Sequence, residues 1–120
     1  MNDTIPPISV SIWQHDDRRY IFNVKDQDGV DIPDVTVFSE LTFIIAPYVT
    51  SPPFLTKTFS GGDIIMLPPS QVYFDIRHAE SGALQPGNFY CELKGISAGT
   101  TQTLGAGTAT VIDTNIGDYS

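Results

Sequence analysis

The chain has 120 residues, enough for one domain that buries a single hydrophobic core. Its six basic and fourteen acidic residues give a net charge of −8, which disfavours nucleic-acid binding because phosphates would be repelled. No apolar run approaches the ~20 residues of a membrane helix, and the acidic start of the chain does not resemble a signal peptide. We therefore expect a folded domain with neither a nucleic-acid nor a membrane partner.

The first seven residues predict an extended arm. The adjacent prolines Pro6 and Pro7 prevent a helix, and Ile5 and Met1 are the bulky apolar residues of this segment. Because proline has already restricted the backbone, an arm of this kind loses little entropy when it docks on a neighbouring protein. We expect an arm over residues 1–7, a β-sandwich over 8–112 and a polar tail over 113–120.

Two strands are predicted next, over residues 8–13 and 20–25. In each, apolar and mostly polar positions alternate, which is typical of a strand that buries one face. The inward positions are Ile8, Val10 and Ile12 in the first strand and Tyr20, Phe22 and Val24 in the second. The second strand runs into Asp26-Gln27-Asp28-Gly29, an Asp-Gly turn of the type that ends hairpin strands.

Four acidic residues crowd around this turn and raise the question of a calcium site. They are Asp26, Asp28, Asp31 and Asp34. Oxygen ligands at such spacing can hold calcium, but the distal glutamate of an EF-hand loop is missing. Aspartate is also common in turns because its side chain bonds to the backbone two residues on. We expect turn chemistry here, and no metal site.

Further short strands follow, over residues 41–45, 54–59, 63–67 and 72–77. Prolines and glycines separate them, and Lys57 is expected outward or at a sheet edge. Residues 78–84 have room for one helical turn.

The clearest strand follows the turn at Pro86-Gly87. Phe89, Cys91 and Leu93 are expected on its buried face, while Tyr90, Glu92 and Lys94 alternate with them on the outer face. As the only cysteine, Cys91 cannot form an internal disulfide, so we interpret it as a small core residue.

Glycines weaken the strand pattern of residues 97–107, so the last strand is expected over 109–112. Seven to nine short strands without a long helical pattern predict an all-β fold, an antiparallel β-sandwich. Its expected core contains Phe22, Phe43, Phe74, Phe89 and Leu93.

The order of these features resembles the immunoglobulin-like domains of tailed-bacteriophage virion proteins, including the N-terminal domains of baseplate and tail-fibre subunits. The matching segments are 19–29, 41–45, 84–93 and 107–111. The resemblance implies an immunoglobulin-like sandwich in a structural protein of the virion. Such a protein is a capsid decoration or cement protein, or alternatively a tail, baseplate or fibre adaptor. Its partners would be the major capsid protein or tail and baseplate proteins, in a homo-oligomer or symmetric array.

Catalysis is not indicated. His15 and His78 are the only histidines, and the sequence contains neither a Gly-x-Ser-x-Gly nor a His-Glu-x-x-His motif. The glycine pairs are not followed by a predicted helix, so they do not indicate a phosphate-binding loop. We expect no enzyme activity, no catalytic residue and no cofactor.

Exposed aromatic residues leave one alternative of another class, a glycan-binding module. Trp13, Tyr20, Tyr48 and Tyr73 would form its platform, although aromatics at alternating strand positions also occur in cores and protein interfaces. For the protein-binding interpretation, the expected contact residues are Met1, Ile5, Pro6, Pro7, Trp13 and Tyr48.

Overall fold

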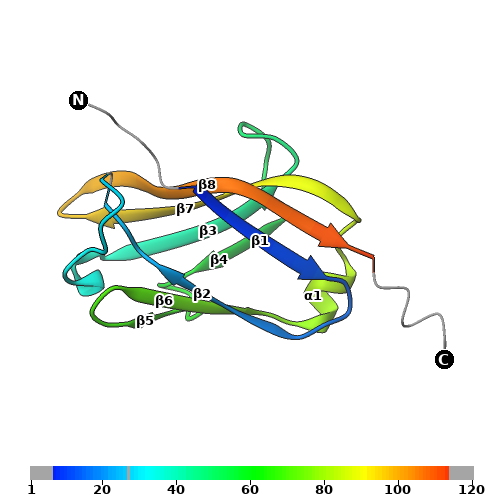
Figure 1. Cartoon of the computed structure of the whole chain (residues 1–120), viewed down its shortest axis with the longest axis horizontal. Coiled ribbons are helices and arrows are strands. Elements are labelled where there is room, and N and C mark those ends of the chain that lie inside the picture. The colour runs from blue at the N-terminus through cyan, green and yellow to red at the C-terminus, as the bar shows by residue number, and fades with distance from the viewer. Residues whose placement is uncertain (1–6, 27, 114–120) are drawn as a thin grey trace.

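The computed structural model describes residues 7–26 and 28–113, which form two packed β-sheets (Figure 1). The strands are β1 (Pro7–Trp13), β2 (Arg18–Asn23), β3 (Glu40–Ala46), β4 (Leu55–Thr58), β5 (Ile64–Leu67), β6 (Gln71–Ile76), β7 (Gly87–Ser97) and β8 (Thr100–Ile112). The described residues also include a 3-10 helix, η1 (Val35–Val37), and one short α-helix, α1 (His78–Gly82). Within them, no helix has the length and apolar character needed to cross a membrane.

The strand order is that of an immunoglobulin-like sandwich. One sheet has the order β1-β8-β7-β3-β4, and the other has the order β2-β6-β5. In the immunoglobulin fold the same arrangement places strands G, F and C in one sheet and B, E and D in the other. The predicted β-sandwich is therefore confirmed, and β1 with β8 is its one parallel pair among the described strands.

Aromatic rings fill the space between the sheets. The ring of Phe43 on β3 lies 4.5 Å from that of Phe74 on β6, and both residues are fully buried. Phe22 on β2 contacts both rings, at 5.8 and 5.6 Å, and Leu93 is buried beside them. Phe89 is only partly buried, but it packs against the same cluster. The five predicted core residues thus face one core.

Cys91 lies in this core, as expected, and its side chain is fully buried. Burial raises the pKa of its thiol to about 11. Since the thiolate is the reactive form of cysteine, this side chain behaves as a small apolar residue at neutral pH.

The last strand is much longer than predicted. β8 begins at Thr100, nine residues before the expected strand, and pairs with β7 from Gly87 to Ser97 across one register shift. Gly107 is needed there for close approach, because a Cβ at this position would lie 1.8 Å from the carbonyl oxygen of Ile8 on β1. Glycine in β8 therefore permits the parallel pairing with β1, whereas the sequence suggested only a weakened strand.

Two charged residues are buried against expectation. Lys57 lies on an edge strand, β4, which is one of its two expected placements, but its side chain points inward and is only 8% exposed. Glu92 occupies the polar phase of β7 and is nevertheless buried. Its Oε1 accepts a hydrogen bond from the Tyr90 hydroxyl at 2.5 Å, and its Oε2 lies 3.3 Å from Lys94 Nζ. Burial, followed by this hydrogen bond, raises the pKa of Tyr90 to about 12.

Candidate functional site

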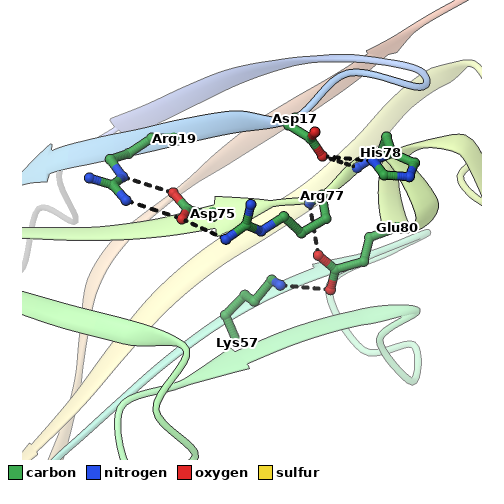
Figure 2. A network of polar contacts seen from close by, with 7 residues as sticks. All are labelled: Asp17, Arg19, Lys57, Asp75, Arg77, His78 and Glu80. Atoms are coloured by element: carbon green, nitrogen blue, oxygen red, sulfur yellow. Dashed lines mark hydrogen bonds and ion pairs between the residues drawn. The ribbon is translucent and has the colours of Figure 1, made fainter.

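A network of charged side chains covers one flank of the sandwich, near the end where α1 lies (Figure 2). At its centre is Asp75 on β6, which accepts two hydrogen bonds from the Arg19 guanidinium at 2.8 and 3.2 Å. Arg77 approaches the same carboxylate at 3.6 Å from the other side. The antiparallel register of β2 and β6 sets this arrangement, because it places Arg19 directly opposite Asp75.

Arg19 is held in place from a second direction. Its guanidinium lies over the ring of Tyr73, 4.1 Å from the centroid, in a cation–π contact. The bidentate bond from Arg19 is the main reason that the pKa of Asp75 lies below its ordinary value, and the same bond raises the pKa of Arg19. Arg19 and Asp75 are therefore both charged at neutral pH and fixed in orientation.

Glu80 on α1 links this network to the opposite sheet. One carboxylate oxygen accepts from the Arg77 backbone N–H at 2.9 Å, and the other lies 2.6 Å from Lys57 Nζ on β4 (Figure 2). Burial opposes the ionised form of Glu80, but these two contacts outweigh it and lower its pKa. The short helix is thus tied to an edge strand of the five-stranded sheet.

The turn between β1 and β2 is bonded to α1 as well. Asp17 accepts from the His78 backbone N–H at 2.6 Å and lies 3.0 Å from its Nδ1, and Ser81 donates to the Asp16 carbonyl at 3.0 Å. The bond from the His78 N–H is the largest cause of the lowered pKa of Asp17. These contacts position α1, and the buried hydroxyl of Ser81 is committed to the backbone.

An apolar groove of about 680 Å³ opens at the same end of the sandwich. Its lining comes from the loop between β3 and β4, from β4, from α1 and the residues after it, and from β7: Pro47, Phe54, Leu55, Thr56, Glu80, Ala83, Leu84, Gln85 and Phe89. The rings of Phe54 and Phe89 meet edge to face at 5.1 Å. In the loop beside this end groove, Tyr48 is 74% exposed and Val49 is 65% exposed. Exposed apolar residues beside an apolar groove are typical of protein contact surfaces.

Of the predicted contact residues, the structure describes three, and Pro7 and Trp13 lie at opposite ends of β1. Met1, Ile5 and Pro6 lie outside the described residues, so the expected arm remains a prediction. Pro7 is the first residue of β1 and pairs with Ala106. Trp13 lies at the other end of β1, under the Arg18 guanidinium at 5.8 Å, whereas Tyr48 lies beside the end groove.

The four candidate aromatics for a glycan platform are also dispersed. Tyr20 points inward, stacks on Phe74 at 5.8 Å and donates a hydrogen bond to the Ser11 carbonyl. Tyr73 lies on the outer face of the three-stranded sheet beneath Arg19. The structure therefore places these rings on different faces of the sandwich.

The acidic residues around Gly29 act in turns. Asp26 accepts from the backbone N–H groups of Asp28 and Val30, at 2.9 and 3.1 Å. Asp31 pairs with Lys25 at 2.7 Å, and Asp34 accepts from the Thr36 N–H at the start of η1. Within residues 7–26 and 28–113, no three histidine, cysteine or acidic side chains are grouped so that they could hold a metal ion.

Sequence reasoning missed both the charged network and the end groove. Arg19 follows Asp16 and Asp17 closely in the sequence, whereas its partner Asp75 is 56 residues away. The alternation of apolar and polar residues in β2 and β6 indicates which side chains point outward. It does not indicate that these two strands pair with each other. Comparison of the sequence with protein-family models and with curated proteins finds no match. Function is therefore inferred from the fold, from these surfaces and from the resemblance in the order of motifs.

Proposed function

We propose that this chain is a non-enzymatic structural protein of a bacteriophage particle, where it binds neighbouring virion proteins as a capsid decoration or cement protein. A tail, baseplate or fibre adaptor is the alternative within the same class. The observation that carries the protein-binding role is the end groove, walled by Phe54 and Phe89 and flanked by the exposed Tyr48 and Val49.

The geometry favours a protein partner over a small substrate. The end groove is mainly apolar and lies beside a loop whose apolar side chains face solvent, so a partner could cover both together. Aromatic residues that line such pockets frequently supply most of the binding energy at protein interfaces. The charged groups beside the end groove, Lys57 and Glu80, are already paired with one another.

The order of the sequence motifs, which resembles that of immunoglobulin-like domains in tailed-bacteriophage virion proteins, supports a role in a phage particle. The segments that carry it contribute to β2, β3, β7 and β8, which are strands of both sheets. In the proposed role, the arm predicted over residues 1–7 provides a second attachment; its last residue, Pro7, is the first residue of β1.

Particle attachment can be measured directly. Purified particles of the encoding phage, stripped of this chain, are mixed with the wild-type protein and with the Phe54→Ser variant, and binding is followed by sedimentation. Phe54 is 42% exposed, so the variant should fold while losing a wall of the end groove. Val37→Ser is the matched control, because Val37 is 54% exposed on η1, at the opposite end of the sandwich.

We expect the wild type and the Val37→Ser control to bind and the Phe54→Ser variant to bind at least tenfold more weakly. If the wild-type chain is not a component of particles and does not rebind them, the virion role is wrong. If it rebinds and Phe54→Ser binds equally well, another surface makes the contact. Deletion of residues 1–6 then tests whether the arm is that surface.

A further inference from the structure

The outer face of the three-stranded sheet combines charge with exposed apolar side chains. The register places Ile21, Tyr73 and Ile65 in one row across β2, β6 and β5. Ile21 is 54% exposed and Ile65 is 40% exposed, so two aliphatic side chains flank the Tyr73 ring in solvent. Arg19 and Asp75 form the next row, and Arg77 follows β6. We name these residues the arginine face: Arg19, Ile21, Ile65, Tyr73, Asp75 and Arg77.

Basic residues gather at the arginine face although the chain is acidic. Two hollows, of about 380 and 290 Å³, share Arg19, Asp75 and Arg77 in their linings. Together the hollows are lined by four of the chain's six basic residues but by only three of its fourteen acidic ones. All three arginines of the sequence are among them.

The arginines have different tasks in this arrangement. Arg19 donates two hydrogen bonds to Asp75, so its hydrogen-bonding edge is already occupied (Figure 2). The Tyr73 ring holds its guanidinium from a second direction. Arg77 makes a 3.6 Å ion pair with Asp75, which is longer than the ~2.7–2.9 Å of a strong charge-assisted hydrogen bond. Its side chain is 68% exposed and borders both hollows. The Arg77 guanidinium therefore retains donors for an incoming acceptor.

We propose that the arginine face binds a short acidic segment of a partner protein. A carboxylate of that segment pairs with the Arg77 guanidinium, and an adjacent apolar side chain packs on the row of Ile21, Tyr73 and Ile65. Arginine suits this task because its planar fork matches a carboxylate with two parallel hydrogen bonds. Tyrosine and arginine are also the residue types most enriched at interface hot spots.

The net charge of −8 distinguishes a short acidic peptide from an extended polyanion. Nucleic acid and anionic membranes present many negative charges over a wide area, and the acidic remainder of the molecule would repel them. The one or two carboxylates of a short peptide interact mainly with the groups they touch, because salt screens interactions between charges more than ~8 Å apart. The surface therefore fits a peptide segment. This proposal concerns a different surface from the end groove and does not depend on it.

Peptide titration followed by amide chemical shifts of the labelled protein tests the proposal. The probe is a nine-residue peptide of sequence Gly-Ser-Val-Thr-Glu-Val-Glu-Ser-Gly, and its matched control carries glutamine in place of both glutamates. An oligothymidylate of similar length is the polyanion probe. We expect the acidic peptide to shift amides of β2, β5 and β6, and to bind about tenfold more tightly than its glutamine counterpart.

Variants locate the contact. Arg77→Gln should weaken binding of the acidic peptide about tenfold, and Ile65→Thr should weaken both peptides. Lys94→Gln is the control, because Lys94 is a base on the other sheet and its side chain is 47% exposed. Both Arg77 and Ile65 have large exposed fractions, and circular dichroism verifies that their variants fold.

Three results would overturn the proposal. The first is equal binding of the acidic and glutamine peptides, or absence of binding by both. The second is undiminished binding by Arg77→Gln. The third is tighter binding of the oligothymidylate than of the acidic peptide, which would instead indicate a phosphate-binding surface.

Discussion

Lys57 on β4 and Glu80 on α1 form an ion pair that ties the short helix to an edge strand of the five-stranded sheet, with Nζ 2.6 Å from Oε2. The Lys57 side chain is 8% exposed and that of Glu80 is 35% exposed. Lysine is almost never buried to this extent without a partner, because transfer of an ammonium group out of water is costly. The pair therefore fixes α1 against β4, and α1 in turn supplies one wall of the end groove.

Because Lys57 is more buried than Glu80, we expect substitution of the two residues to lower the free energy of unfolding by different amounts. Glu80→Ala leaves the buried Lys57 ammonium unpaired and should lower the free energy of unfolding by about 1–3 kcal/mol. Lys57→Met keeps most of the buried volume, and Glu80 can still contact water and the Arg77 N–H, so it should cost less. Urea unfolding of both variants measures the difference. A larger loss in Lys57→Met than in Glu80→Ala would contradict this account of the pair.

Stability should fall at low pH because paired carboxylates have lowered pKa values. The pKa of Asp75 lies below its ordinary value, mainly through the bonds from Arg19, and that of Glu80 is lowered as well. A carboxyl group whose pKa is lower in the folded than in the unfolded state stabilises the fold at pH values above its unfolded-state pKa, which is about 4. This stabilisation is lost as the pH falls through the folded-state pKa. We expect the free energy of unfolding to decline below about pH 4–5.

Asp75→Asn tests the source of this decline, since asparagine keeps the shape but cannot ionise. The variant should be less stable than wild type at pH 7, and the two should converge as the pH falls towards 3. Urea midpoints measured between pH 3 and pH 7 provide the comparison. A constant difference across this range would show that the Arg19–Asp75 pair does not contribute through charge.

The depth of each aromatic ring in the core predicts the cost of its removal. Phe43 is fully buried between Phe22 and Phe74, so Phe43→Ala should cost about 3–5 kcal/mol through lost transfer energy and a cavity. Phe89 is partly buried at the wall of the end groove, so Phe89→Ala should cost less. Denaturant unfolding gives both values. A loss below about 1 kcal/mol for Phe43→Ala would show that the assigned strand register is wrong.

Gly107 allows β1 to join the five-stranded sheet. A Cβ at this position would meet the Ile8 carbonyl oxygen and carbon at 1.8 and 2.9 Å, and backbone atoms cannot move aside without loss of strand pairing. Gly107→Ala should therefore displace β1, with a loss of about 1–3 kcal/mol. Hydrogen exchange should show faster exchange of the β1 amides, while Thr108→Ala, at an exposed neighbouring position, should leave them protected. Protected β1 amides in Gly107→Ala would contradict the close approach of β1 and β8 at this glycine.

Alternation in the sequence is enough to predict most of this fold. Phe22, Phe43 and Phe74 occupy the apolar phase of their strands, and a one-residue change in register would move each of them to solvent. Buried faces are therefore encoded locally, as is the turn at Gly29, whose N–H bonds the Asp26 carbonyl at 3.0 Å. The parallel pairing of β1 with β8 is different, because it requires the β1 backbone to approach Gly107 without a clash. No alternation of residues near Gly107 in the sequence indicates this contact.

The candidate surfaces could not be predicted in the same way, because each joins residues distant in sequence. Arg19 meets Asp75, Lys57 meets Glu80, and Phe54 meets Phe89. In the sequence, Arg19 stands near Asp16 and Asp17, and Lys57 is expected outward or at a sheet edge. The pairing of β2 with β6 brings the first two partners together, and α1 brings Glu80 to Lys57. The third pair meets because β4 and β7 both pair with β3.

The location of this chain in averaged electron-microscope images of the phage proposed to encode it tests the central proposal most directly. The account predicts density for the sandwich in a regular array on the particle, with the end that carries Phe54 and Phe89 against a neighbouring subunit. Absence of such density from complete particles, or an array in which this end faces solvent and makes no contact, would contradict it.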